Sequence, residues 1–330
     1  MINLSTQYMG LELKNPLVVA SCGLTGSVDG IKNLEKYGAA AVVLKSIFEE
    51  EILLDTPGQQ EAIRKRNLVY SGFNETLDYI NLNIKKNSLN RYLELIQNAK
   101  KAVDIPIIAS VNCISDEAWL YFIQKAEDAG ADGLELNLFL HPADFENREF
   151  DKVYFRIIEK ALESVDIPVS IKVSKYFTRM GPMLKALSAT GISGLVLFNR
   201  FFTPDIDIDK MQIGAGKYFT TPEDMYDTLR WITIMSGRVG CDLAASSGIH
   251  SGDEAIKMLL AGAMVTQLAS TLYKNGPDQL RRILKKLNQW MEEKGFEHID
   301  QFRGRLAGIY ENNPAAFERM QFMKQYSEIR

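Results

Sequence analysis

The chain has 330 residues, of which 46% are hydrophobic and 24% charged, and its formal net charge is −4. This mix is typical of a globular protein with a large core, and the weak negative charge offers no basic field for nucleic acid or an anionic membrane. No apolar stretch approaches the roughly 20 residues of a membrane span, and the first ten residues do not read as a signal peptide. Cys22, Cys113 and Cys241 lack CxxC spacing, so we expect reduced thiols, no zinc site and a cytoplasmic protein.

Short apolar runs rich in β-branched residues recur along the chain and predict eight strands, which occupy residues 16–21, 40–46, 105–112, 133–138, 167–173, 194–199, 241–248 and 264–270. Helical spacing of apolar residues predicts helices between them, at 29–37, 90–102, 116–129, 152–165, 179–190, 222–235 and 253–261. Near-continuous apolar strands that alternate with helices indicate a parallel sheet covered by helices. Eight such units favour closure into a (β/α)8 TIM barrel of the α/β class.

Three segments exceed the barrel repeat. Residues 47–88 and 200–221 are too long for plain connections and are interpreted as insertions. Residues 276–330 are expected to form extra C-terminal helices outside the barrel. No linker or low-complexity tract interrupts the chain, so a single domain over 1–330 is expected.

Polar side chains end most of the predicted strands, where the functional site of such a barrel lies. They are Ser21, Lys45, Ser46, Asn112, Asn137, Lys172, Asn199, Ser246–Gly248 and Ser270. Alternation along a strand predicts that Lys172 and Glu135 point into the barrel on neighbouring strands, where they could pair. Each residue alone has a structural interpretation, as a solvated strand tip or a turn former. Together they suit a planar, electron-accepting ring with carbonyl and ring-nitrogen edges.

The last two predicted strands end in small polar residues typical of phosphate binding in barrels. Ser246–Gly248 and Ala269–Thr271 offer backbone N–H groups and hydroxyls, and Gly248 would permit close approach of an anion. Small residues at these positions are also compatible with tight turns alone.

The order of these motifs resembles the dihydroorotate dehydrogenase family over nearly the whole chain. The motifs that carry the resemblance are ASCG (20–23), LKS (44–46), SVN (110–112), ELN (135–137), IKV (171–173), SSGI (246–249) and AST (269–271), together with an N-terminal segment, 4–16, similar to the family's opening hairpin. The segments LVLFNRFFTPDIDI (195–208) and PAAFERMQFMK (314–324) are similar to a dihydroorotate dehydrogenase-like subgroup.

The resemblance implies an FMN-dependent oxidoreductase of pyrimidine biosynthesis that transfers a hydride from a dihydroorotate-like CH–CH substrate. It further implies a soluble electron acceptor and makes a homodimer plausible. Ala20, Ser21 and Ser46 would lie at the flavin, and Lys45 and Lys172 would place positive charge near its ring edge, with Lys45 also a catalytic candidate. Asn112, Asn137 and Asn199 would hydrogen-bond the ring or substrate, and Ser247, Gly248, Ala269 and Ser270 would bind the phosphate.

Two departures concern the substrate side. The family's catalytic base, a Cys or Ser three residues after the ELN asparagine, is replaced by Leu140, and the asparagine-rich substrate loop expected within 66–76 has no clear counterpart. Ser247 also stands where the family usually has a second glycine. His141 is a candidate base, against the interpretation of an ordinary loop histidine, and Cys113 is a second candidate, against that of a buried space-filling residue.

Two other functions remain open from the sequence. A lyase or isomerase acting on a phosphorylated metabolite would keep the barrel and the phosphate site and use Lys172 as a Schiff-base amine. A flavin-binding protein without catalysis would keep the cofactor alone. The colour and reducibility of the purified protein separate these hypotheses.

Overall fold

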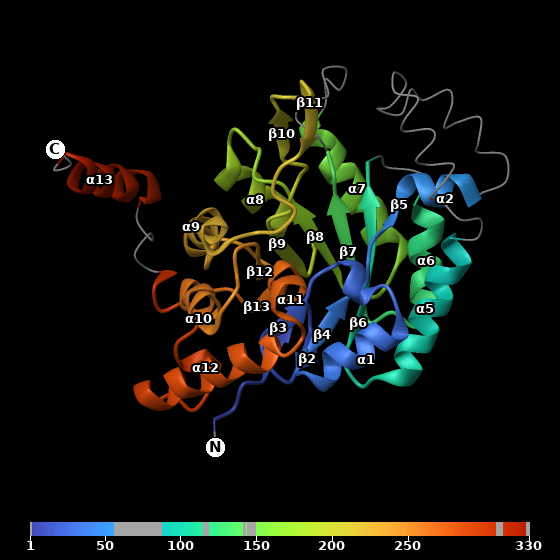
Figure 1. The fold of residues 1–330 in the computed structure, drawn as a ribbon, viewed down its shortest axis with the longest axis horizontal. Coiled ribbons are helices and arrows are strands. Elements are labelled where there is room, and N and C mark those ends of the chain that lie inside the picture. Colours follow the sequence, from blue (N-terminus) through green and yellow to red (C-terminus); the bar gives the residue numbers. More distant parts are fainter. Residues whose placement is uncertain are drawn as a thin grey trace.

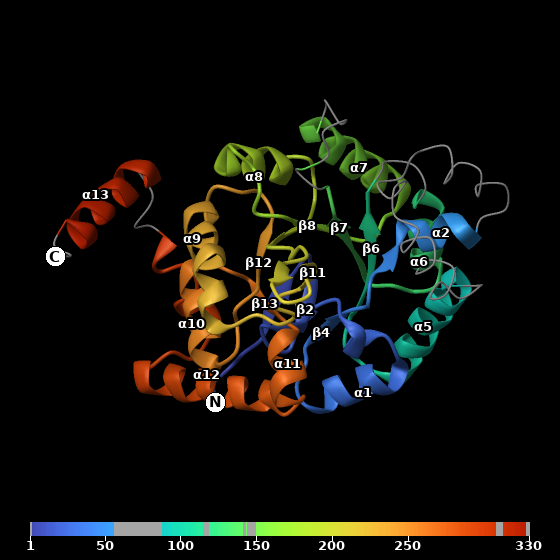
Figure 2. The ribbon, with the colours of Figure 1, turned by 45° about the horizontal axis from the view of Figure 1, so that its top comes forward.

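The computed structural model describes residues 2–55, 88–114, 119–140, 143, 150–307 and 313–327, and these form a closed parallel barrel surrounded by helices (Figure 1, Figure 2). Its strands are β3 (Leu17–Val19), β4 (Ala41–Val43), β5 (Ile47–Phe48), β6 (Ile107–Cys113), β7 (Gly133–Leu138), β8 (Val169–Val173), β9 (Gly194–Leu197), β12 (Asp242–Ser246) and β13 (Val265–Leu268). Neighbours pair in the order β4-β3-β13-β12-β9-β8-β7-β6, and β4 pairs again with β6 to close the ring. The eight predicted strands and the TIM barrel are therefore confirmed. The two-residue β5, beside β6, was not predicted.

The helices lie outside the strands, as Figure 2 shows, and each predicted helix is found with small shifts of its ends. They are α1 (Val28–Lys36), α2 (Glu49–Asp55), α5 (Ser88–Ala102), α6 (Leu120–Asp128), α7 (Phe150–Ser164), α8 (Met180–Ser188), α9 (Met225–Met235), α10 (Gly252–Ala261), α11 (Ser270–Asn275), α12 (Gln279–Lys294) and α13 (Pro314–Tyr326). The ends of α10 follow from its sequence, because Ser251 and Glu254 form a capping box and Gly262 ends the helix at φ +112°.

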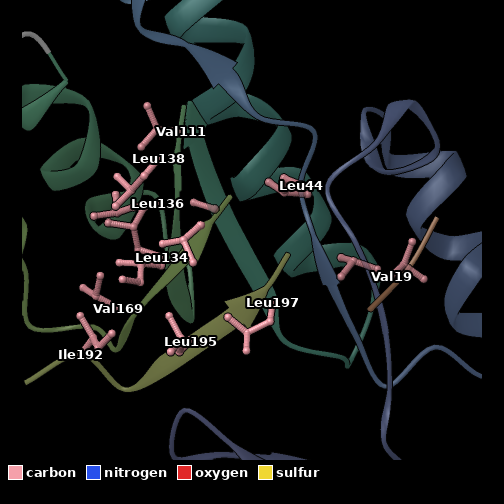
Figure 3. Close-up of a cluster of buried hydrophobic side chains, with 14 of the residues drawn as sticks. Val19, Leu44, Val111, Leu134, Leu136, Leu138, Val169, Ile192, Leu195 and Leu197 are labelled. Carbon is pink, nitrogen blue, oxygen red and sulfur yellow. The ribbon is translucent and has the colours of Figure 1, made fainter. Parts of the chain in front are cut away.

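Strand alternation divides the apolar residues into two cores. The outer core packs the sheet against the helices, and Figure 3 shows part of it, including Val19, Leu136 and Leu195. The inner core joins inward-facing residues such as Val18 and Val196 to the N-terminal hairpin of β1 (Thr6–Tyr8) and β2 (Leu11–Leu13). The predicted opening hairpin thus closes the end of the barrel opposite the strand carboxyl ends.

Additional elements extend the barrel at its carboxyl end and its C-terminus. The insertion after β9 contains an exposed antiparallel hairpin, β10 (Pro204–Asp207) and β11 (Gln212–Ala215), where the sequence predicted only an insertion. The extra C-terminal helices are confirmed as α12 and α13. Helix α13 stands away from the barrel in both views and buries none of its side chains, although its Glu318 pairs with Arg230 at 2.9 Å. Within the described ranges, no helix is long and apolar enough to cross a membrane.

Candidate active site

A cavity of about 230 Å³ opens at the carboxyl ends of the strands and collects most of the predicted cofactor residues. The predicted residues that line it are Ala20, Ser21, Asn137, Lys172, Asn199, Ser247, Gly248, Ala269 and Ser270. Lys45, Ser46 and Asn112 are not among its lining residues. Lys45 is exposed beside Gly26, while Ser46 and Asn112 are buried next to the mouth.

The floor of the cavity holds a buried charged group. Lys172 is only 7% exposed, and its Nζ donates to Gln267 Oε1 at 2.9 Å. Gln267 Nε2 donates in turn to Glu135 Oε2 at 2.6 Å, and the Lys172 Nζ to Glu135 Oε1 distance is 3.9 Å. The predicted inward pairing of Lys172 with Glu135 is therefore confirmed, with an amide from β13 as a third member. Gln267 was not predicted, because it lies in a run that otherwise indicates only a buried strand.

A row of hydroxyls lies on the β3 and β4 side of the mouth. The hydroxyl oxygens of Ser21 and Ser46 are 2.9 Å apart, and those of Ser46 and Ser110 are 2.8 Å apart. Tyr92 anchors the row from α5, because its hydroxyl accepts from Ser110 N at 2.8 Å and donates to Ser110 O at 3.1 Å. These contacts fix Ser21 at the cavity wall.

The opposite wall consists of paired amides. Asn199 Nδ2 donates to Asn137 Oδ1 at 2.5 Å, and Asn199 Oδ1 accepts from Arg200 N at 2.8 Å. The Arg200 guanidinium then donates to the backbone carbonyls of Lys217 and Tyr218 at 2.6 and 3.1 Å. Arg200 thus fastens the insertion that carries β10 and β11 to the rim of the cavity.

The β12 and β13 end of the cavity gains groups from that insertion and from α11. Thr220 N donates to Ser270 Oγ at 3.1 Å, Lys274 Nζ donates to Thr220 O at 2.8 Å, and His250 Nε2 lies 2.9 Å from Thr220 Oγ1. Burial and the Lys274 charge lower the pKa of His250. Thr220 therefore links the predicted phosphate residue Ser270 to the Lys274 ammonium and to His250. Thr220 and Lys274 were not predicted, because they lie outside the strand-end motifs.

Gly248 has a structural role beyond the one predicted for it. It adopts φ +71°, and a Cβ at this position would lie 2.1 Å from Met225 N, at the start of α9. The close approach that the glycine allows is therefore first of all that of the α9 backbone. Ser247 adopts φ +84°, the left-handed region that the second glycine of the family motif would enter without strain.

The residues that follow β6 and β7 are apolar and aromatic in their described part. Leu140 is 5% exposed within the outer core, and Phe139 lies 4.4 Å from Phe201 between ring centroids. Cys113 is fully buried in the outer core, as the space-filling interpretation expects, and burial raises its pKa well above the ordinary value. His141 and the predicted substrate loop at 66–76 lie outside the described residues.

A model of the family described as dihydroorotate dehydrogenase matches residues 3–291. The chain belongs to the dihydroorotate dehydrogenase family. It is 29% identical over 312 residues to the dihydroorotate dehydrogenase B (NAD(+)) catalytic subunit of Thermoplasma volcanium, covering 92% of this chain and 98% of that protein. It is 23% identical over 332 residues to dihydroorotate dehydrogenase A (fumarate) of Lactococcus lactis subsp. lactis, covering 93% and 100%. The resemblance inferred from the sequence is confirmed.

The first prediction concerns Gly248. Gly248→Ala should lower the free energy of unfolding by at least about 1 kcal/mol more than Gly237→Ala, because both positions have positive φ but only Gly248 meets a backbone. Gly237 adopts φ +75°, and a Cβ added there would have no described heavy atom within 4 Å. Urea unfolding of the two variants measures the difference, and equal losses would contradict the steric argument.

The second prediction concerns His250. Because its folded-state pKa is lowered, the unfolded chain binds more protons near pH 6, so His250 should make the protein less stable as the pH falls through the ordinary histidine value of about 6.5. His250→Gln should therefore reduce the stability lost between pH 7.5 and pH 5.5. Thermal unfolding of both proteins at the two pH values measures this, and an unchanged loss would exclude His250 as its source.

Proposed function

We propose that this member of the dihydroorotate dehydrogenase family is an FMN-dependent oxidoreductase that acts on a CH–CH donor related to dihydroorotate. The observation that carries the proposal is the placement of a buried ammonium, paired amides and a hydroxyl around one cavity at the carboxyl ends of the strands. The proposal includes a soluble electron acceptor, a homodimer and a single FMN-binding domain over 1–330.

The donor set of the cavity fits a flavin ring. Lys172 brings positive charge to the cavity floor, and Ser21, Asn137 and Asn199 bring hydrogen-bonding groups to its walls. Carbonyl oxygens and ring nitrogens of the flavin are suitable partners for these groups. Bound FMN would supply the acceptor for a hydride from the substrate, while the Lys172 charge stabilises the electron-rich reduced ring.

The β12–β13 end of the same cavity fits the phosphate group. Ser247, Gly248, Ala269 and Ser270 line it, and Lys274 is bound to the backbone of Thr220, which also lines it. One anion site beside one ring site suits a mononucleotide, and the chain has no dinucleotide fingerprint.

The residues of the site say less about the substrate than about the cofactor. Leu140 cannot accept a proton, so this chain needs another base or a substrate whose proton leaves more easily. His141 remains the candidate in the sequence, and Lys45, exposed beside Gly26, remains a second catalytic candidate.

The lyase hypothesis fits the geometry less well. A Schiff base would first require a neutral Lys172 amine as the nucleophile, and at that step the buried Glu135 carboxylate would lose its cation.

The third prediction tests the cofactor. Heat-denatured protein should release stoichiometric FMN and no FAD, identified by fluorescence and chromatography. Release of FAD, or failure to take up FMN on incubation, would contradict the proposal. Reduction of the bound flavin and its reoxidation by fumarate, quinone or oxygen would separate an active enzyme from a flavin-binding protein without catalysis.

The fourth prediction concerns Leu140. General-base assistance is worth about 10²–10⁴ in rate, so the wild-type protein should reduce its flavin with dihydroorotate slowly or not at all. Because Leu140 packs into the outer core, Leu140→Cys should raise that rate only if the substrate pocket accepts dihydroorotate and the smaller thiol turns toward the cavity. Anaerobic stopped-flow absorbance measures the bleaching, with Leu140→Ala as the control for the change in size. Fast bleaching by the wild type that His141→Ala abolishes would instead assign the base to His141.

A further inference from the structure

Gln267 joins the two buried charges of the barrel interior. It is 2% exposed on β13, and its carboxamide accepts from Lys172 and donates to Glu135. This orientation of the amide is fixed by its neighbours, because an ammonium can only donate and a carboxylate can only accept. The flipped amide would place its NH₂ against Lys172 and its oxygen against Glu135.

The Gln267 amide bridges Lys172 and Glu135, whose charged groups do not form a direct hydrogen bond. Lys172 Nζ and Glu135 Oε1 are 3.9 Å apart, whereas a direct charge-assisted hydrogen bond is about 2.8 Å long. Glu135 Oε1 has no hydrogen-bond partner among the described residues, and Glu135 is fully buried. An attraction between opposite charges at this depth is strong, so it draws Lys172 toward Glu135.

We propose that Gln267 is a positioning residue that holds the Lys172 ammonium at the cavity floor against the attraction of Glu135. The inference rests on the proposed function, because the group that benefits from the ammonium is the flavin ring. Without the Gln267 oxygen, the Lys172 ammonium lowers its energy by moving into direct contact with the Glu135 carboxylate. Its charge then lies farther from the cavity. Without the negative charge of Glu135, the positive electrostatic potential of Lys172 at the cavity is stronger.

The two changes therefore have opposite consequences for a ring that becomes electron-rich on reduction. Gln267→Met, which keeps the length of the side chain without its amide, should weaken binding of reduced FMN relative to oxidised FMN. Glu135→Gln, which keeps the shape without the charge, should strengthen it. We expect about a tenfold change in each direction, which corresponds to about 30 mV for a two-electron couple.

The experiment is a redox titration of FMN bound to the purified protein, with the dissociation constant of oxidised FMN measured in parallel. Ser170→Ala is the matched control, since Ser170 is buried on β8, donates to Leu134 O and has no hydrogen bond with Lys172 or Gln267 among the described residues. It should leave the potential unchanged. Lys172→Met in the same titration tests the premise, and should lower the potential at least as far as Gln267→Met.

The outcomes separate the inference from the proposed function. A lower potential in Gln267→Met and a higher one in Glu135→Gln support the positioning role. A Gln267→Met potential equal to or above that of the wild type overturns it. If Gln267→Met does not fold, Glu135→Gln still decides, because an unchanged or lower potential overturns the role. An effect of Lys172→Met without one of Gln267→Met rejects only the inference, whereas a protein that binds no FMN rejects the proposed function as well.

Discussion

The constraint on which the site depends is the burial of a charged lysine inside a barrel. An ammonium that is 7% exposed is stable only if the interior supplies partners, and Lys172 finds them on β7 and β13. Those strands come together only when the sheet closes, because Gln267 is 95 residues from Lys172 and 132 from Glu135. The polar interior and the closed barrel therefore require each other.

The apolar inner core below Lys172 also determines the surroundings of its charge. Tyr8 and Met9 of the N-terminal hairpin pack against inward-facing Val18 and Val196 and close the opposite end of the barrel. Water is thereby kept from one side of the buried charges, and their remaining open side faces the cavity. The chain thus directs the field of Lys172 toward the place where a ligand can bind.

The features that depend on strand periodicity, namely the barrel strands and the direction of their side chains, could be predicted from the sequence. Eight buried strands have a period of two, so the inward direction of Lys172 and Glu135 followed from Ile171, Val173 and their neighbours. The role of Gln267 could not be predicted, because no neighbouring residue in the sequence distinguishes it from any other polar residue in a strand. Contacts such as Thr220 with Lys274 depend on how an insertion folds back, which local pattern does not specify.

The difference between strand ends and loops also explains why the predicted cofactor residues match the family motifs better than the predicted substrate residues do. Residues assigned to the cofactor belong mainly to strand ends, where the closed sheet fixes their positions. Substrate contacts in a barrel come mainly from the loops beyond those ends, which vary at little cost to the fold. Leu140 illustrates this difference, since it lies two residues after β7 and packs into the outer core instead of presenting a base. A chain can therefore keep the geometry for redox chemistry at its strand ends while its loops select a different substrate.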